Sequence, residues 1–248
     1  MVKVKVGTNA TWSGTGSHQI TSPTAGSYTI TLANTTGYTD TGELQVAIVA
    51  GITTTLAVSA SLSVTVSLVA SSEAVNGATT SVESTATTMP FGVMTVNNDK
   101  VGAHSIAVST NASEGYTVLT KWLGTGESDG LTSSSNNCDG FGYNSATNAS
   151  PQAWAAGTNP SGSSANVDTC WYGYTTADTA LGTGTADRFT SSGGNKWAPF
   201  DSTAYEVIYS SGPVNAESTL VGHKVEVNAM QPQGSYTGTV EYIATAVF

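Results

Sequence analysis

Apolar and hydroxyl-bearing residues alternate through the segment TLAVSASLSVTVSLVA, residues 55–70. Apolar side chains recur at every second position from Leu56 to Leu68, with Ser, Thr or Ala between them. A period of two places each set on one face of a β-strand, whereas a helix needs apolar residues three and four positions apart. The pattern predicts one long strand over residues 56–68. It argues against a membrane span, because lipid favours a predominantly apolar segment.

The same alternation recurs along the chain, interrupted by clusters of Gly, Asn, Asp and Ser that favour turns. It predicts further strands at residues 27–34, 43–50, 91–96, 104–111, 115–122, 204–210, 222–229 and 235–248. The strands at 104–111 and 115–122 are expected to form a hairpin. No segment shows a convincing helical period. We therefore expect an all-β protein, an antiparallel β-sandwich of jelly-roll or immunoglobulin-like topology.

The pattern also predicts how the chain is organised. Residues 1–52 should form an N-terminal β segment or small module, and residues 53–248 the main sandwich. Within the sandwich, residues 123–202 are rich in Gly, Ser, Asn and Thr and lack regular alternation. We expect this region to leave the sandwich as a long loop excursion.

The two ends of the chain carry alternating segments with different expected roles. At the N-terminus an apolar face alternates with two lysines, which is typical of an edge strand. This strand could pair within its own subunit or be donated to a neighbour's sheet, and its inward residues are Val2, Val4 and Val6. At the C-terminus we expect a closing strand that is paired on both sides. One face of that strand would hold Tyr236, Val240, Tyr242 and Ala244.

Charge narrows the function classes. The net charge is -10 with seven Lys and Arg in 248 residues, so no basic patch is available to bind nucleic acid. Only 10% of residues are charged, against about 25% in typical proteins, and hydroxyls therefore solvate most of the surface. The first residues lack the apolar core of a signal peptide, so we expect a mature or trimmed product.

Two cysteines, Cys138 and Cys170, lie in the loop-rich region. We expect them to form a disulfide that staples the excursion; the alternative is a pair of free thiols in a reducing compartment. A disulfide and a hydroxyl-rich surface together favour an extracellular location.

The excursion also concentrates aromatic residues beside Asn, Asp and Ser. Rings in such surroundings can stack on sugars, and the candidate glycan-binding residues are Tyr143, Trp154, Tyr172, Tyr174 and Trp197. The competing interpretation is that the aromatics form a small core around the disulfide, with Trp171 the residue best placed to be buried.

Signals for catalysis or metal binding are weak. The histidines His18, His104 and His223 stand apart in sequence, and we interpret them as surface or strand-edge side chains rather than a metal site. Carboxylates of the excursion could hold Ca²⁺, although no EF-hand spacing is present; they are Asp139, Asp168, Asp178, Asp187 and Asp201. No acid and base pair or nucleophile motif appears, so we expect no enzyme, no metal site and no cofactor.

Several segments resemble a family of largely uncharacterised secreted Ser/Thr-rich β-sandwich surface proteins of small-genome bacteria. The resemblance rests on DTGELQVAIVAG, SIAVSTNASEGYTVLTKW and the final IYSSGPVNAESTLVGHKVEVNAMQPQGSYTGTVEYIATAVF. The closing QGSYTGTV is also similar to the last strand of WxL-type domains and camelysin-like fibre proteins. This resemblance implies an extracellular β-sandwich, and several such proteins polymerise by strand exchange.

We therefore expect an extracellular structural protein, a subunit of a cell-surface filament or coat assembled as a homopolymer by β-strand addition. The alternative is a monomeric adhesin module that binds glycans or another cell surface through the aromatic-rich excursion.

Overall fold

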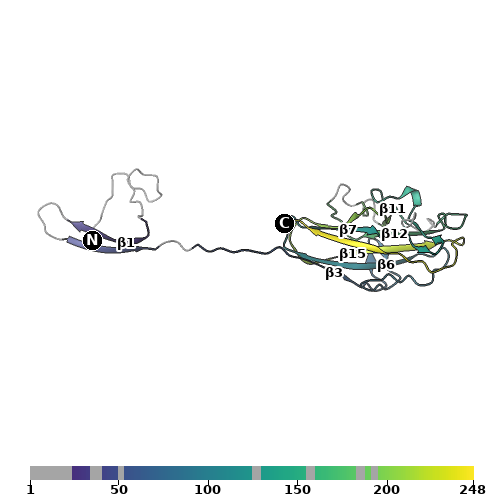
Figure 1. The fold of residues 1–248 in the computed structure, drawn as a ribbon, viewed down its shortest axis with the longest axis horizontal. Coiled ribbons are helices and arrows are strands. Elements are labelled where there is room, and N and C mark those ends of the chain that lie inside the picture. The colour runs from purple at the N-terminus through teal and green to yellow at the C-terminus, as the bar shows by residue number, and fades with distance from the viewer. Residues whose placement is uncertain are drawn as a thin grey trace. The chain divides into compact units, whose positions relative to one another are not determined.

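The computed structural model describes residues 24–33, 41–49, 53–124, 130–154, 160–182, 188–190 and 195–248. The chain forms two compact units, Met1–Val58 and Ser59–Phe248 (Figure 1). The predicted donor residues Val2, Val4 and Val6 lie outside the described residues. The described part is built from β-strands and one short 3-10 helix, η1 (Tyr143–Ser145), which confirms the predicted all-β class.

The described part of the first unit is one antiparallel hairpin of β1 (Gly26–Ala33) and β2 (Thr41–Ile48). Tyr28 lies opposite Val46, and Ile30 lies opposite Leu44, so their side chains share one face. The alternating pattern predicted both strands, because each has one apolar and one polar face.

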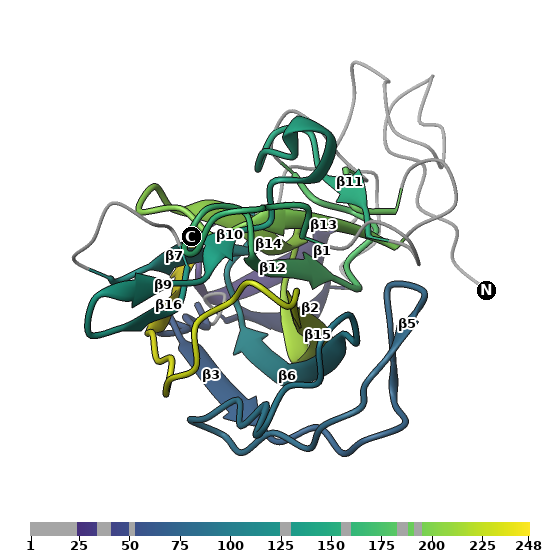
Figure 2. The ribbon, with the colours of Figure 1, turned by 90° about the vertical axis from the view of Figure 1, so that its right-hand side faces the viewer.

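The second unit contains two principal sheets (Figures 1 and 2). The seven-stranded sheet runs in the order β11 (Gln152–Ala153), β13 (Lys196–Pro199), β12 (Cys170–Thr176), β15 (Val214–Val227), β6 (Lys100–Thr110) and β3 (Leu62–Ser67), with β10 (Asp139–Gly140) also paired to β12. The three-stranded sheet runs β14 (Tyr205–Ser210), β7 (Tyr116–Trp122) and β16 (Val240–Ala246). Two small hairpins complete the list: β4 (Ala74–Val75) with β5 (Ala78–Thr79), and β8 (Thr132–Ser133) with β9 (Asn136–Asn137).

One hydrophobic core joins the two principal sheets. The seven-stranded sheet contributes alternate residues of its long strands, such as Ile106 of β6 and Val221 of β15, and the other sheet contributes Val118 and Ile208. All four side chains are at most 1% exposed. Burial of this apolar surface is the main term that stabilises the unit.

A second core covers the opposite face of the seven-stranded sheet. It combines residues of β6 and β12 with residues of the excursion and of the segment before β6. Its buried members are Val69, Val75, Val101, Ala103, Phe141, Ala146, Trp154, Trp171 and Trp197. The rings of Phe141 and Trp154 are stacked, with centroids 4.3 Å apart. The sheet is therefore buried on both faces in its middle.

This double burial explains why part of the excursion was mispredicted. Strand β12 is a central strand rather than a loop, and all seven of its residues are buried. Trp171 contributes to the second core, while Tyr172 and Tyr174 contribute to the first. Because both faces of β12 are apolar or aromatic, the strand has no alternation to detect.

Three other strand predictions were wrong in detail. The strand expected over residues 56–68 is formed only at Leu62–Ser67, and residues 91–96 form no strand. The strands that follow one another as β6 and β7 are not a hairpin, because they belong to different sheets. The turn between them carries the chain from one sheet to the other, so both strands still face the same core.

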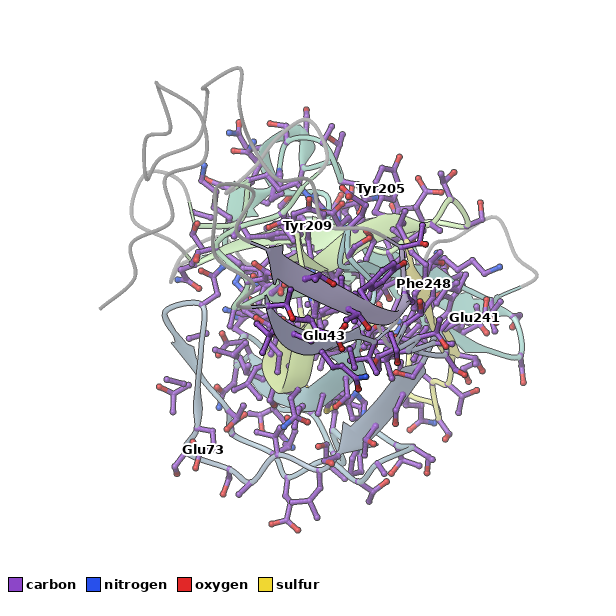
Figure 3. The ribbon with its side chains drawn as sticks, turned by 90° about the vertical axis from the view of Figure 1, so that its left-hand side faces the viewer. Glu43, Glu73, Tyr205, Tyr209, Glu241 and Phe248 are labelled. Atoms are coloured by element: carbon purple, nitrogen blue, oxygen red, sulfur yellow. A yellow bond between two sulfur atoms is a disulfide. The ribbon has the colours of Figure 1, made fainter. Side chains whose placement is uncertain are left out.

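The closing strand β16 was predicted correctly in its faces and wrongly in its position. Tyr236, Val240, Tyr242 and Ala244 pack against the first core, as expected. However, β16 is an edge strand: among the described strands it pairs with β7 alone, not with strands on both sides. Phe248, which follows it, is 59% exposed (Figure 3). No helix in the described part of the chain is long and apolar enough to cross a membrane.

Candidate functional site

Two buried charged side chains lie on the face of β15 that Trp154 of the second core covers. Residues two apart in a strand point to the same side, so Lys224 and Glu226 share the face opposite to that of His223 and Val225. Lys224 is 5% exposed and Glu226 is 4% exposed. Charged side chains are rarely buried to this extent unless they are paired.

Lys224 is surrounded by an acid, a carbonyl and two indole rings. Its Nζ lies 2.5 Å from Oδ2 of Asp99 and donates a hydrogen bond of 3.2 Å to the carbonyl oxygen of Trp154. The same nitrogen lies 5.0 Å from the ring centroid of Trp154 and 5.6 Å from that of Trp197. These contacts hold the amine at one position beside the Asp99 carboxylate.

Glu226 completes the cluster. Its Oε2 accepts a hydrogen bond of 2.8 Å from Nε1 of Trp154. Burial raises the pKa of the Glu226 carboxyl, the negative charge of Asp99 raises it further, and the Trp154 hydrogen bond and Lys224 oppose this rise. The site therefore contains a buried amine, a carboxylate at contact distance and a second carboxyl group with increased proton affinity.

A cavity of about 360 Å³ opens beside this cluster. Its lining residues are Ala78, Thr79, Ser81, Asp99, Val101, Trp154, Asn195 and Lys224. Asp99 lies at the solvent side, with 43% of its side chain exposed, whereas Lys224 lies at the inner side. The cavity therefore connects the cluster with solvent.

Most of the predicted glycan-binding residues cannot stack on a sugar. Trp154, Tyr172, Tyr174 and Trp197 are each at most 4% exposed, whereas Tyr143 is 39% exposed. Tyr172 and Tyr174 lie in the first core, and the two tryptophans lie in the second. The prediction of a five-residue aromatic surface was wrong for these four residues, because the excursion uses its rings to cover the sheet.

The predicted disulfide is present. Cys138 and Cys170 are bonded, with their Cα atoms 4.6 Å apart. The bond joins the residue before β10 to the first residue of β12, and these two strands pair in parallel. It therefore fixes the excursion to the central sheet.

The interpretation of the histidines as surface or strand-edge side chains was wrong for the two described residues. His104 and His223 are 7% and 2% exposed and lie in neighbouring strands, with ring centroids 5.4 Å apart. His223 is hydrogen-bonded through Nδ1 to the Tyr172 hydroxyl at 2.8 Å and through Nε2 to the Tyr242 hydroxyl at 2.9 Å. Burial lowers the pKa of both histidines, and that of His223 falls to about 3. His18 lies outside the described residues.

Three of the carboxylates considered for Ca²⁺ accept hydrogen bonds from backbone amides, and a fourth, Asp168, accepts one of 3.4 Å from the indole N–H of Trp171. Asp139 accepts a hydrogen bond of 2.8 Å from the backbone amide of residue 168. Asp178 accepts hydrogen bonds from the amides of residues 180 and 209, and Asp201 accepts one from the amide of residue 203. The predicted candidate Asp187 is outside the described residues. Among the described residues, no three His, Cys, Asp or Glu side chains form a group that could hold a metal ion.

The Lys224 cluster could not be predicted from the sequence. In HKVEV, residues 223–227, the charges alternate with apolar residues in the way that normally indicates a solvent-exposed face. That face is covered by Trp154, which lies 70 positions away in sequence from Lys224.

Comparison of the chain with protein families, with curated proteins and with solved structures finds no match.

Proposed function

We propose that the protein is an extracellular structural subunit that assembles with copies of itself by β-strand addition. The observation that carries the proposal is the open edge at β3. Among the described strands, β3 pairs only with β6, which leaves one side of its backbone unpaired. Such an edge is a template for a strand from another molecule.

The side chains of β3 fit the role of an acceptor. Val66 packs against the first core, but Leu62 and Val64 on the same face are each 40% exposed. A strand added beside β3 would cover this apolar row while its backbone satisfied the free donors and acceptors. Charged side chains on an exposed edge strand usually prevent it from pairing with other molecules, and Leu62–Ser67 contains none.

The segment before β3 supplies a donor. Residues 53–58 form no strand, and in them Leu56 is 89% and Val58 is 74% exposed. Their alternation continues that of β3, so both side chains would face a neighbour's core. Burying one Leu or Val contributes about 1.5 to 3 kcal/mol before the costs of association. Val2–Val6 is a second possible donor with the same alternating pattern.

Head-to-tail addition makes a heterologous contact, which propagates as a filament when it closes no ring. An extracellular location is supported by the Cys138–Cys170 disulfide, which persists in oxidising compartments, and by the hydroxyl-rich composition. Burial of Trp154 and Trp197 removes the main support for the glycan-binding alternative.

Sedimentation velocity and negative-stain microscopy of the parent protein and three variants test the proposal. Val58→Asp should leave the melting of the second unit unchanged and prevent filaments, because a carboxylate would enter a neighbour's core. Val4→Asp examines the second donor in the same way. Val93→Asp is the matched control, since Val93 is 89% exposed in a loop, and it should assemble normally. A parent protein that stays monomeric at all concentrations would contradict the proposal.

A further inference from the structure

We propose that Lys224 and Asp99 become joined by an amide bond, so that a covalent cross-link connects β15 with the segment preceding β6. The inference concerns the interior of one subunit and does not rest on the proposed assembly. Its basis is the cluster that the buried Lys224, Glu226 and Trp154 form with the more exposed Asp99.

The reacting atoms are already in position. Nζ of Lys224 lies 2.5 Å from an oxygen of the Asp99 carboxylate, and the carbonyl of Trp154 and two indole rings hold the amine there. Holding two groups in a reactive geometry replaces an encounter in solution by an intramolecular step. The buried Lys224 ammonium also carries a desolvation cost, which a neutral amide would remove.

Glu226 is placed to move the protons. It shares the face of β15 with Lys224, and the hydrogen bond from Trp154 fixes its carboxyl group. Lys224 and Glu226 are two residues apart in β15, so their side chains leave the strand on the same side. Burial raises the pKa of the Glu226 carboxyl, which favours its protonated form and suits it to pass a proton on.

The step balances without any further reactant. A proton passes from the Lys224 ammonium through Glu226 to the Asp99 carboxylate, and the free amine attacks Cγ of Asp99. The Nζ–Cγ bond forms, and Glu226 carries a second proton from Nζ to the departing hydroxyl group. The Cγ–O bond then breaks, and one water leaves through the adjoining cavity, on the side where Asp99 is exposed. Nothing is oxidised or reduced.

Mass spectrometry of the whole chain tests the inference. After full reduction of the disulfide, the parent protein should be lighter than its sequence mass by one water molecule. Trypsin should fail to cleave after Lys224, so residues 6–100 and 197–248 should appear as one linked species. A succinimide at Asp139–Gly140 would also lose one water, but it would leave these two peptides separate.

Two variants and one control complete the experiment. Lys224→Arg and Glu226→Gln should both restore the full sequence mass and the separate peptides. Lys121→Arg should retain the water loss, because Lys121 is in a partly exposed ion pair with Glu241 at 3.0 Å and is not part of the Lys224 cluster. A parent protein of full mass, or one that has lost water without a linked peptide, overturns the cross-link, even if Lys224→Arg fails to fold. A linked peptide in Glu226→Gln overturns the role of Glu226.

Discussion

Acidification should destabilise the protein through His223, which is buried as a neutral imidazole between two tyrosine hydroxyls. Burial, with a smaller effect from His104, lowers the pKa of His223 from 6.5 to about 3. Because the folded-state pKa is depressed, the contribution of His223 to stability is fully present above pH 6.5. It is lost progressively as the pH falls from 6.5 toward about 3, since the unfolded chain then binds a proton that the folded chain does not.

The size of this effect follows from the two pKa values. At pH 5 the unfolded histidine is protonated and the folded one is neutral. Since pH 5 lies about 1.5 units below the unfolded pKa, the contribution of His223 to the free energy of unfolding is about 2 kcal/mol smaller than at pH 7. The assay is urea unfolding of the parent protein and of His223→Gln at pH 7 and pH 5. Glutamine retains one donor group and one acceptor for Tyr172 and Tyr242 but does not titrate.

The free energy of unfolding should fall by about 2 kcal/mol more in the parent protein than in His223→Gln over this interval. Other groups titrate nearby: burial lowers the pKa of His104 and raises the pKa values of Asp139 and Glu226. The two raised carboxyl pKa values favour the folded state at low pH, opposite to the histidines. These groups are common to both proteins, so the difference isolates His223. Parallel pH profiles would refute the reasoning.

Three further perturbations should have distinct results. Replacing Cys138 and Cys170 together with serine opens a loop with a sequence separation of 32 residues. The free energy of unfolding in urea should fall by about 3 to 4 kcal/mol, and an unchanged midpoint would exclude a stabilising role of the disulfide. Gly222→Ala should lower the free energy of unfolding by about 1 to 3 kcal/mol, because a Cβ there would lie 2.9 Å from Thr175 and 3.1 Å from Val75; Gly212→Ala, with nothing within 4 Å, is the control and should be near neutral. Deleting residues 236–248 removes Tyr242 and its neighbours from the first core and should abolish cooperative melting, so a truncated chain with the parent's transition would contradict the assigned packing.

Strands with alternating apolar and polar side chains could be predicted from the sequence, because a period of two is typical of an extended strand. The hairpin β1–β2 and the inward face of β16 are examples. The pairing of Cys138 with Cys170 could also be predicted, since two cysteines allow one bond. In each case local pattern or simple counting carries the information.

The rest depended on contacts between distant segments. Strand β12 is apolar on both faces because the excursion folds back over the sheet, and a pattern of period two cannot show this. The same layer buries Lys224 and Glu226, whose alternation with valines otherwise indicates an exposed face. The candidate site could not be predicted because its residues lie far apart in the sequence and meet only in the folded chain.

Hydrogen–deuterium exchange of β3 tests the central claim, that this edge accepts a strand from a neighbouring copy, most directly. The protein is compared in its sedimented and dispersed forms, and Val93→Asp and Val58→Asp are carried through the same procedure. Strand addition predicts that amides in Leu62–Ser67 exchange more slowly in the sedimented parent protein and in Val93→Asp, and that Val58→Asp shows no such change. Equal exchange of these amides in sedimented and dispersed parent protein would contradict assembly through β3.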